Sequence, residues 1–600
     1  MEPKTLDKIK PESVITLHGL FKERVKRSGD KIAYRYFDKE SEAWKDISWN
    51  QAATNVARMQ AAIAKEGLDI GDRVAIMAPN CPNWGHFEQA AMGLGLVVVP
   101  LYTNDRADNI AYVLQDSGTK ILFIEGHEQL QALEEISSQM DGLVRIISIS
   151  PCKKYHHFTR LQSMDEWLED IPTSVDGSQL QNVECKATDL ATIVYTSGTT
   201  GRPKGVMLSH DNLLQNVDYG TKSLPIYTED IFLSFLPLSH SLERMAGYCI
   251  PMLTGATMAF ARSVQDLGED LLTIKPTVLV SVPRIYERVQ RKIYDQLEHK
   301  PEFAQKLFHK AVETGWQRFK KPGSSPLLWP VLNTLVAKKV MAKLGGRLRI
   351  AICGGAPLSP SVAKTFMGLG LNLYQGYGLT ETSPVISVNK AGQNDPASVG
   401  PPLDNVEVKI GDNDELLTRG PCVMLGYWHN QKATDEMIDK DGWLHTGDKA
   451  RIENGYIYIT GRIKEILVLS NGEKVPPSDM EMAIAMDPLF EQIMVIGEGR
   501  PCLTALATLN IDQWRKLAES LSVPSDDPTV LKDKKILDVA LKRISHQIKS
   551  FPGYAQIKKV ALSLDPWTVE NGLITPTLKL KRNRILEHFE SEVEQFYSER

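Results

Sequence analysis

The feature that most constrains the fold is a regular alternation of helical patterns with short apolar runs. Residues 49–68 have helical periodicity, and the apolar run 72–80 follows them directly. The same alternation continues at 85–101, 119–125, 144–150, 230–238, 277–283 and 347–355. Strands that alternate with helices pair in a parallel sheet, and the helices then cover both of its faces. The sequence therefore predicts an α/β fold of parallel-type layers, with further helices over 290–345.

The pattern changes in the last third of the chain. From about 399 to 460, short strands are separated by Gly, Asp and Asn, which predicts an antiparallel meander or a small β-barrel. A smaller α+β unit follows, with helices around 530–550. Because 600 residues exceed one ordinary core, we expect at least two units. We place a large N-terminal domain at 1–461 and a small, mobile C-terminal domain at 462–600.

Charge and cysteine usage exclude several classes of protein. A net charge of -5 argues against a general nucleic-acid binder, because neutralising phosphates requires a basic surface. The seven cysteines are odd in number and never spaced as CxxC, which favours reduced thiols over disulfides or zinc. The longest apolar run, Ala90–Tyr102, is shorter than the roughly 20 residues of a membrane-spanning helix. We therefore expect a cytoplasmic protein, and peripheral contact with the inner face of a membrane stays open.

The most informative stretch is TIVYTSGTTGRPKGVMLSH, Thr192–His210. A β-rich run leads into a loop of Thr, Ser and Gly, then Pro203 and Lys204, and then a helical pattern. Glycines let backbone N–H groups approach a polyanion, and hydroxyls and a lysine add donors and positive charge. The loop is not a Walker motif, because its length differs and Pro203 disfavours a helix start. A surface loop is the alternative for any short glycine-rich stretch, but this composition over ten residues favours a phosphate loop.

TSGTTGRPKG resembles the phosphate-loop signature of the adenylate-forming superfamily, which includes acyl-CoA synthetases, peptide-synthetase adenylation domains and beetle luciferases. CGGAP (353–357) resembles the segment that backs the adenine, and YQGYGLTET (374–382) resembles the next signature. An aromatic ring such as Tyr377 can cover a purine face. Thr380 could bond the α-phosphate, and Glu381 offers Mg²⁺ a hard oxygen ligand. The resemblance implies an ATP site made of Thr196, Ser197, Gly198, Thr199, Thr200, Gly201, Lys204, Gly354, Gly355, Ala356, Pro357, Gln375, Gly376, Tyr377, Gly378, Asp448 and Arg462.

Three more blocks continue the resemblance toward the C-terminus. DGWLHTGD (441–448) is similar to the ribose-binding block, with Asp448 as the residue that accepts from the ribose hydroxyls. GRIKE (461–465) is similar to the junction of the two domains, where Arg462 would reach the ribose or phosphate and Lys464 would be the hinge. A plain surface lysine is the alternative for Lys464, and its position favours the hinge.

NGLITPTLKLKR (571–582) resembles the catalytic-lysine loop, although Leu578 stands where a glycine is more common. Lys579, Lys581 and Arg582 are all candidates, and counting to the residues that follow favours Lys579. A mobile lysine there would stabilise negative charge as the mixed anhydride forms. PLSHSLER (237–244) and TPTLKLKR resemble the long-chain fatty acyl-CoA synthetase branch, which puts His240 near the acyl carboxylate. A hydrogen-bonded structural histidine is the alternative for His240.

The implied function is AMP-forming synthesis of acyl-CoA from a long-chain fatty acid, ATP and coenzyme A, with Mg²⁺. The implied catalytic set is Lys579, Thr380, Glu381 and His240. The alternatives are an acyl-AMP ligase that serves a carrier protein and a synthetase for a non-fatty acid. The block after Asp448 ends in GRIKE and not in a DRKK-type hinge, so chain length stays open. Oligomeric state also stays open, with a homodimer as one alternative, as does transient contact with a membrane surface.

Overall fold

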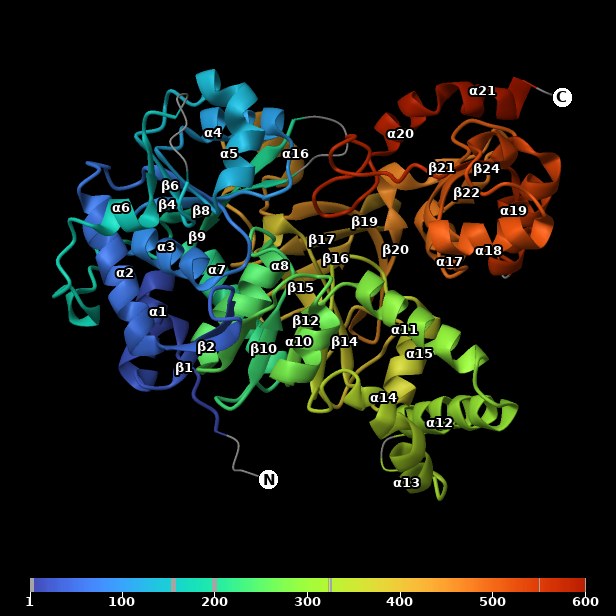
Figure 1. The fold of residues 1–600 in the computed structure, drawn as a ribbon, viewed down its shortest axis with the longest axis horizontal. Helices are drawn as coiled ribbons and strands as arrows, with labels where there is room; N and C mark the ends of the chain where they lie inside the picture. The colour runs from blue at the N-terminus through green and yellow to red at the C-terminus, as the bar shows by residue number, and fades with distance from the viewer. Residues whose placement is uncertain are drawn as a thin grey trace.

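The computed structural model describes residues 5–152, 158–196, 202–321, 323, 326–549 and 551–598, with the backbone alone at Lys464. Two eight-stranded sheets dominate the N-terminal part, and a four-stranded and a three-stranded sheet follow toward the C-terminus. Figure 1 shows the C-terminal elements, in orange and red, gathered at one end of the molecule. The predicted α/β class, with a smaller C-terminal unit, is confirmed.

The first large sheet confirms the alternation predicted for residues 49–150. Its strands are, in spatial order, β18 (Gly426–Tyr427), β9 (Lys204–Ser209), β8 (Leu190–Thr196), β4 (Val97–Pro100), β3 (Arg73–Met77), β5 (Ile121–Ile124), β6 (Arg145–Ser148) and β7 (Leu161–Ser163). The strands from β8 to β7 are parallel. The helix α2 (Trp49–Ala64) leads into β3, α3 (Pro82–Gly93) connects β3 to β4, and α4 (Ala107–Ser117) connects β4 to β5. Residues 204–209 form a strand antiparallel to β8, whereas the sequence predicts a loop leading directly into a helix. Alternate side chains Val206 and Leu208 are buried there, which stabilises the strand.

The second large sheet presents two of the sequence motifs, CGGAP (353–357) and GLTET (378–382), at its carboxyl edge. Its strands are, in order, β15 (Val385–Val388), β14 (Leu373–Gly378), β13 (Ile350–Cys353), β12 (Val278–Ser281), β10 (Ile231–Ser234), β11 (Thr257–Phe260), β1 (Ile32–Asp38) and β2 (Ala43–Ser48). The hairpin of β1 and β2 is not predicted by the sequence patterns. The parallel strands β13 and β14 end at the CGGAP and GLTET segments, so both segments emerge at one edge, where ligands of α/β sheets bind.

The region of short strands is antiparallel, as predicted. β16 (Glu407–Ile410), β17 (Glu415–Arg419), β19 (Leu444–Glu453) and β20 (Tyr456–Arg462) pair in that order. The first and last strands are not neighbours in this order, so the sheet corresponds to the meander alternative. β18 lies between β17 and β19 in sequence but pairs with β9 of the first large sheet. This pairing ties the antiparallel region to the strand that follows the phosphate loop.

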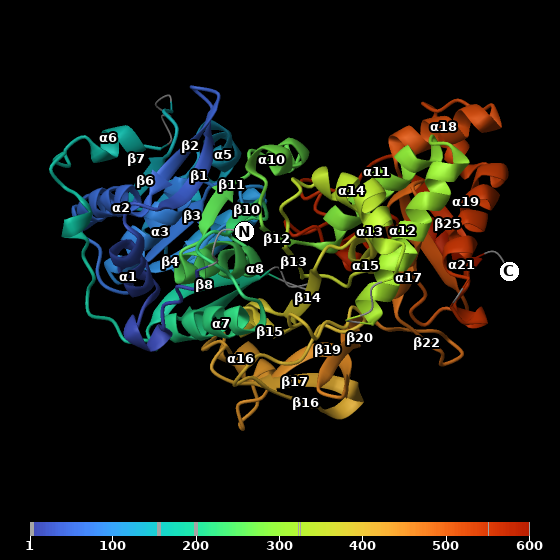
Figure 2. The same ribbon diagram turned by 90° about the horizontal axis from the view of Figure 1, so that it is seen from below.

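The C-terminal part has its own hydrophobic core. β23 (Phe490–Ile496), β24 (Leu503–Leu509) and β25 (Ile557–Ser563) form a sheet, with α17 (Pro477–Ile484), α18 (Ile511–Leu521) and α19 (Lys534–Gln547) around it. Phe490, Trp514 and Ile544 lie in this core. Figure 2 shows these elements beside α11 (Pro283–Glu298), where the Arg291 side chain donates to the Ala485 carbonyl at 2.9 Å. None of the described helices is long and apolar enough to cross a membrane.

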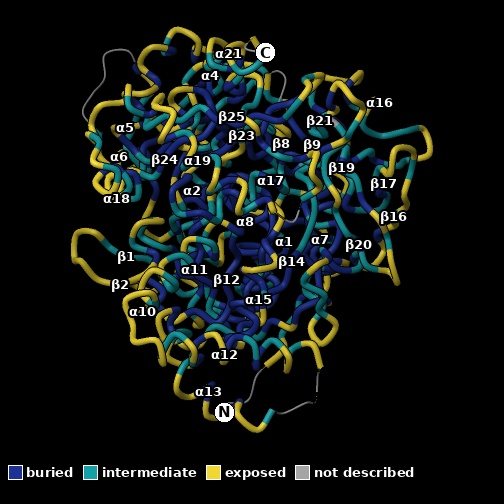
Figure 3. The backbone as a smooth tube through the Cα atoms, turned by 90° about the vertical axis from the view of Figure 1, so that its right-hand side faces the viewer, coloured by how far each residue is buried: buried dark blue, intermediate teal, exposed yellow. Residues whose placement is uncertain are grey.

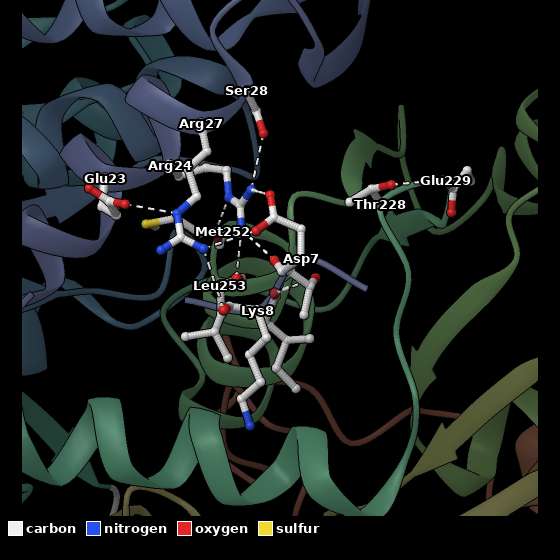
Figure 4. A network of polar contacts seen from close by, with 12 residues as sticks. Asp7, Lys8, Glu23, Arg24, Arg27, Ser28, Thr228, Glu229, Met252 and Leu253 are labelled. Atoms are coloured by element: carbon white, nitrogen blue, oxygen red, sulfur yellow. Dashed lines mark hydrogen bonds and ion pairs between the residues drawn. The ribbon is translucent and has the colours of Figure 1, made fainter. Parts of the chain in front are cut away.

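A buried arginine fastens the N-terminal segment to the large domain. Arg24 on α1 (Leu17–Ser28) is fully buried, and its guanidinium donates to the Asp7 carboxylate at 2.7 Å. It also donates to the carbonyls of Met252 and Leu253 at 2.9 and 2.8 Å, as Figure 4 shows. A buried charge is tolerated when its donors are paired. Arg24 thus holds residues near Asp7 against α9 (Ile250–Thr254).

Candidate active site

The predicted phosphate loop connects two antiparallel strands, β8 and β9. Its residues Ser197, Gly198, Thr199, Thr200 and Gly201 lie outside the described residues, so their predicted ATP contacts stay predictions. Thr196 ends β8 and Lys204 begins β9, and these two residues are paired in the register of the hairpin. The hairpin therefore fixes both ends of the loop at one edge of the first large sheet.

Tyr427 contacts both Lys204, at the end of this loop, and Glu381 of the GLTET segment. The Lys204 ammonium lies 5.0 Å from the centre of the Tyr427 ring, and the Tyr427 hydroxyl donates to Glu381 Oε1 at 2.8 Å. Burial raises the pKa of Tyr427, and the Glu381 charge raises it further, so the hydroxyl keeps its proton. Tyr427 was not predicted from the sequence, because its partners are far away in the chain and no motif contains it.

The GLTET segment turns sharply after β14, and this turn requires a glycine. A Cβ atom at Gly378 would collide with the Pro384 carbonyl oxygen. Thr380 begins a 3-10 turn (Thr380–Thr382), and its hydroxyl lies 3.3 Å from that of Ser241. Ser241 is the first residue of α8 (Ser241–Glu243), directly after His240. The close turn therefore brings Thr380 beside the segment that the sequence relates to acyl binding.

The CGGAP segment is held by backbone contacts and by one side chain of the next motif. The Gly354 N–H donates to the Ser281 carbonyl at 3.2 Å, and Gly355 has a positive φ of 80°, which favours glycine. Ala356 and Pro357 are exposed. The Gln375 amide accepts from the Leu358 N–H at 3.3 Å and donates to the Pro396 carbonyl at 2.6 Å. The Gln375 side chain thus supports the loop, which leaves the backbone around Gly376 to approach a base.

Asp448 is buried between two of the predicted site residues. Its Oδ2 accepts from the Tyr377 hydroxyl at 2.6 Å, and its Oδ1 accepts from the Arg462 guanidinium at 2.9 Å. Asp448 and Arg462 face each other across β19 and β20. Desolvation lowers the pKa of Arg462, but the charges of Asp448, Glu465 and Tyr377 and the Asp448 hydrogen bond together outweigh it, and the net shift is upward. Because a carboxylate has about four acceptor positions, Asp448 can still accept from ribose hydroxyls.

The three basic residues of the C-terminal loop have different surroundings. The pKa of Lys579 is lowered, mainly by desolvation and then by Arg462, while Asp448, Glu465 and Glu381 act in the opposite direction. Lys579 therefore lies within electrostatic range of the large domain's site.

The other two basic residues face elsewhere. Desolvation lowers the pKa of Lys581, and the charges that affect this pKa most are those of Asp105 and Arg106. Arg582 donates to both oxygens of the Glu481 carboxylate, at 2.7 and 2.6 Å, inside the C-terminal domain. Site residues are thus among the charges that act on Lys579 but not among those given for Lys581, and Arg582 is paired within its own domain.

His240 is a neutral histidine. Desolvation, followed by the Lys579 charge, lowers its pKa to about 4. Its Nδ1 accepts from the Leu242 N–H at 3.2 Å, so the neutral ring carries its proton on Nε2. His240 also caps the N-terminus of α8. The ring can therefore donate a hydrogen bond from Nε2 at neutral pH, but it brings no positive charge to the site.

The described residues hold no group of three or more His, Cys, Asp or Glu side chains that could bind a metal ion. Mg²⁺ often takes one or two carboxylates together with phosphate oxygens and water. Glu381, whose Oε1 is oriented by Tyr427, fits that requirement as a single protein ligand. The predicted hinge, Lys464, belongs to a 3-10 turn (Ile463–Glu465) directly after β20, and its side chain lies outside the described residues.

A large N-terminal α/β part followed by a smaller C-terminal domain is the architecture of adenylate-forming enzymes, and the family comparisons agree with it. The chain belongs to the AMP-binding enzyme family. The model of that family matches residues 21–428, and the model of the AMP-binding enzyme C-terminal domain matches residues 464–600.

Several relatives extend over most of the chain. The protein named long-chain-fatty-acid–CoA ligase FadD15 from Mycobacterium bovis is 32% identical over 92% of this chain and 93% of its own length. The human long-chain-fatty-acid–CoA ligase ACSBG1 is 29% identical over 98% of this chain and 86% of its own length. Among solved structures, the adenylation domain of carboxylic acid reductase from Segniliparus rugosus, in complex with AMP, has a TM-score of 0.74. It is 22% identical, over 97% of this chain and 94% of that one, and shows the shared fold.

Proposed function

We propose that the protein is an AMP-forming acyl-CoA synthetase for long-chain fatty acids. The fatty acid carboxylate attacks the α-phosphorus of ATP, a bond to phosphorus forms, and pyrophosphate leaves. The sulfur of coenzyme A then attacks the acyl carbonyl of acyl-AMP, the thioester forms, its thiol proton is lost, and AMP leaves. The observation that carries the proposal is the set of contacts that joins the motifs in one site, where Asp448 accepts from Tyr377 and Arg462, and Glu381 accepts from Tyr427.

Charge stabilisation and positioning do the catalytic work in this proposal. Lys579 neutralises charge that develops between the acyl carboxylate and the α-phosphate. Thr380 donates to the α-phosphate, and His240 donates from Nε2 to the acyl carboxylate without an ionic interaction. Glu381 would hold Mg²⁺, which would neutralise negative charge on the phosphate oxygens.

The ATP molecule is held by the loop and the three later motifs. The phosphate loop from Thr196 to Lys204 takes the terminal phosphates, Tyr377 covers the adenine beside Gly354 and Gly376, and Asp448 with Arg462 fixes the ribose. The pairing of Asp448 with both Tyr377 and Arg462 supports this assignment, because it fixes the carboxylate before ATP arrives.

We divide the chain into a large domain at 1–461 and a small mobile domain at 462–600, with Lys464 as hinge. Rotation of the small domain withdraws Lys579 after adenylation and admits coenzyme A. Separate hydrophobic cores before and after the junction support this division, since each unit can move as a body. We expect the enzyme to work in the cytoplasm and to collect its acid at a membrane surface.

The test is AMP release that depends on coenzyme A, measured with ATP, Mg²⁺ and fatty acids of graded length. Acetate and an aromatic acid serve as comparison substrates. AMP and acyl-CoA that appear together, with a maximum among long chains, are the expected result. Pyrophosphate exchange without a thioester would instead indicate a carrier protein as the acceptor, and a maximum with acetate or the aromatic acid would indicate a non-fatty substrate.

A further inference from the structure

The segment after α12 (Glu302–Lys320) exposes an unusual number of aliphatic side chains. It consists of α13 (Trp329–Leu332), a π-helical turn (Asn333–Ala337) and α14 (Lys338–Ala342). Figure 1 shows α13 projecting at the edge of the molecule, away from the C-terminal domain. Leu327 is 97% exposed, Leu328 56%, Val331 55% and Leu335 47%. Such large exposed fractions in neighbouring residues indicate a surface that something else covers.

The opposite face of the same segment is already packed against the protein. Trp329, Leu332 and Ala337 are buried in a cluster with Phe308, Val312 and Leu369. The exposed residues therefore play no part in anchoring α13, because the inner face does so. A helix that is apolar on both faces is normally buried on both. Exposed residues of this segment, such as Leu328 and Val331, therefore alternate with the buried ones, and in Figure 3 the backbone around α13 lies at the edge of the molecule.

This segment is also the most one-sided in charge. Residues 314–349 contain eight basic residues and no acidic residue, in a chain whose net charge is -5. The eight residues are Arg318, Lys320, Lys321, Lys338, Lys339, Lys343, Arg347 and Arg349. Lys338 and Lys339 follow Leu335 by three and four positions, are exposed, and form no ion pair within the described residues. Their charges are therefore free to meet an external anion beside the exposed leucines.

We propose that Leu327, Leu328, Val331, Leu335, Lys338 and Lys339, here called the α13 patch, dock the enzyme on an anionic lipid bilayer. The headgroup boundary of a bilayer accepts aliphatic side chains, while anionic headgroups attract lysines at the rim. A purely aliphatic patch would fit many partners, but the exposed lysines Lys338 and Lys339 next to it favour a surface with many negative charges. The docking does not depend on the proposed function, which it would serve by bringing the enzyme to acids dissolved in the membrane.

The first experiment is vesicle flotation of the full chain without ATP or fatty acid, so that catalysis plays no part. Vesicles of phosphatidylcholine alone are compared with an equal mixture of phosphatidylcholine and phosphatidylglycerol, at low and high salt. We expect binding to the anionic vesicles that falls with salt. Lys338→Glu/Lys339→Glu should weaken it by at least about 30-fold, the effect of about 1 kcal/mol for each lysine. The control Arg515→Glu/Lys516→Glu makes the same charge change at exposed positions on α18 and should bind like wild type.

The second pair of variants tests the apolar residues. Leu327→Ser/Leu328→Ser should weaken binding by about 10-fold or more, because two aliphatic side chains no longer leave water. Ile70→Ser/Leu272→Ser removes two other exposed aliphatic side chains, 68% and 50% exposed, and should leave binding unchanged. Melting curves and activity on octanoate in solution confirm that each variant is folded.

The proposal is overturned if wild type ignores the anionic vesicles or if both patch variants bind them like wild type. If the patch variants instead convert a dimer to a monomer in light scattering and vesicles do not bind, the patch is an interface with a second copy. Vesicle binding without any acyl-CoA synthesis would contradict the proposed function and leave the docking intact. Acyl-CoA synthesis in solution without vesicle binding would contradict the docking and leave the proposed function intact.

Discussion

At the scale of single residues, the surroundings of the C-terminal loop separate three basic side chains that the sequence alone leaves close together. Lys579 interacts with site residues, Lys581 with Asp105 and Arg106, and Arg582 with Glu481. Roles follow from these partners. A charge that stabilises a transition state must lie near it, whereas an arginine paired with a buried glutamate holds the loop in place.

We therefore predict that Lys579→Ala slows adenylation, measured as pyrophosphate exchange, by about 100-fold or more. Thioester formation from supplied acyl-AMP should stay within about threefold of wild type, because no pyrophosphate leaves in that step. Lys581→Ala, two positions away, is the matched control and should retain both half-reactions. Equal loss of both half-reactions in Lys579→Ala would contradict its role.

Acid sensitivity is a second prediction at this scale. His86 is 1% exposed, neither ring nitrogen has a hydrogen-bond partner within the described residues, and desolvation lowers its pKa to about 3. In the unfolded chain this histidine has a pKa of about 6.5, so the unfolded state takes up a proton at a higher pH than the folded state does. The free energy of unfolding therefore decreases as the pH falls below about 6.5. At pH 5 the loss is about 2 kcal/mol.

His86→Leu should therefore lose less thermal stability than wild type between pH 7 and pH 5, as measured by unfolding midpoints across that range. His546→Leu, at an exposed position on α19, is the control and should keep the wild-type loss. If the unfolding midpoint of His86→Leu falls as much as that of wild type between pH 7 and pH 5, the buried ring does not make the fold sensitive to acid.

At the scale of elements, the N-terminal segment depends on one side chain of α1. Arg24→Met would leave the carbonyls of Met252 and Leu253 and the Asp7 carboxylate without their donor. We expect a loss of about 3 kcal/mol, the size typical of breaking a buried pair, seen as a lower midpoint of thermal unfolding.

The control on the same helix is Arg27→Met, whose guanidinium pairs with Glu23 and Asp7 but is 35% exposed. It should cost under about 1 kcal/mol. Equal effects of the two substitutions would show that burial of Arg24 does not decide the stability of this segment.

Elements were predictable from the sequence where a pattern was long. The helices within 290–345 and the strands of the parallel layers repeat their pattern over many residues, and the structure confirms them. Strand β9 and the hairpin of β1 and β2 were missed, because short strands give a weak pattern and pairing with neighbouring strands decides whether they form.

At the scale of the whole molecule, the proposed reaction needs the small domain in two positions. Lys464 lies in a 3-10 turn, whose φ is close to the value that proline imposes. Lys464→Pro should therefore keep the arrangement in which Lys579 faces the large domain, and block rotation away from it. We expect adenylation within about threefold of wild type and a loss of thioester formation of about 100-fold, the opposite of Lys579→Ala.

The two half-reactions are measured separately, by pyrophosphate exchange and by acyl-CoA formation from supplied acyl-AMP. Lys464→Ala removes the side chain but leaves the backbone free, so it serves as the control and should retain both steps. If Lys464→Pro forms thioester at the wild-type rate, rotation does not occur at this residue.

The sequence by itself determined the α/β class and the identity of the family, because helical periodicity, apolar runs and glycine-rich motifs are local properties of the chain. The tertiary structure alone decided which side chains meet: it joined Tyr427 to Glu381 and Lys204, Asp448 to Tyr377, and the Lys579 loop to the large domain. It also decided that the apolar residues beside Trp329 face outward. These contacts connect residues far apart in the chain, and folding brings them together through sheet pairing and packing that no local pattern records.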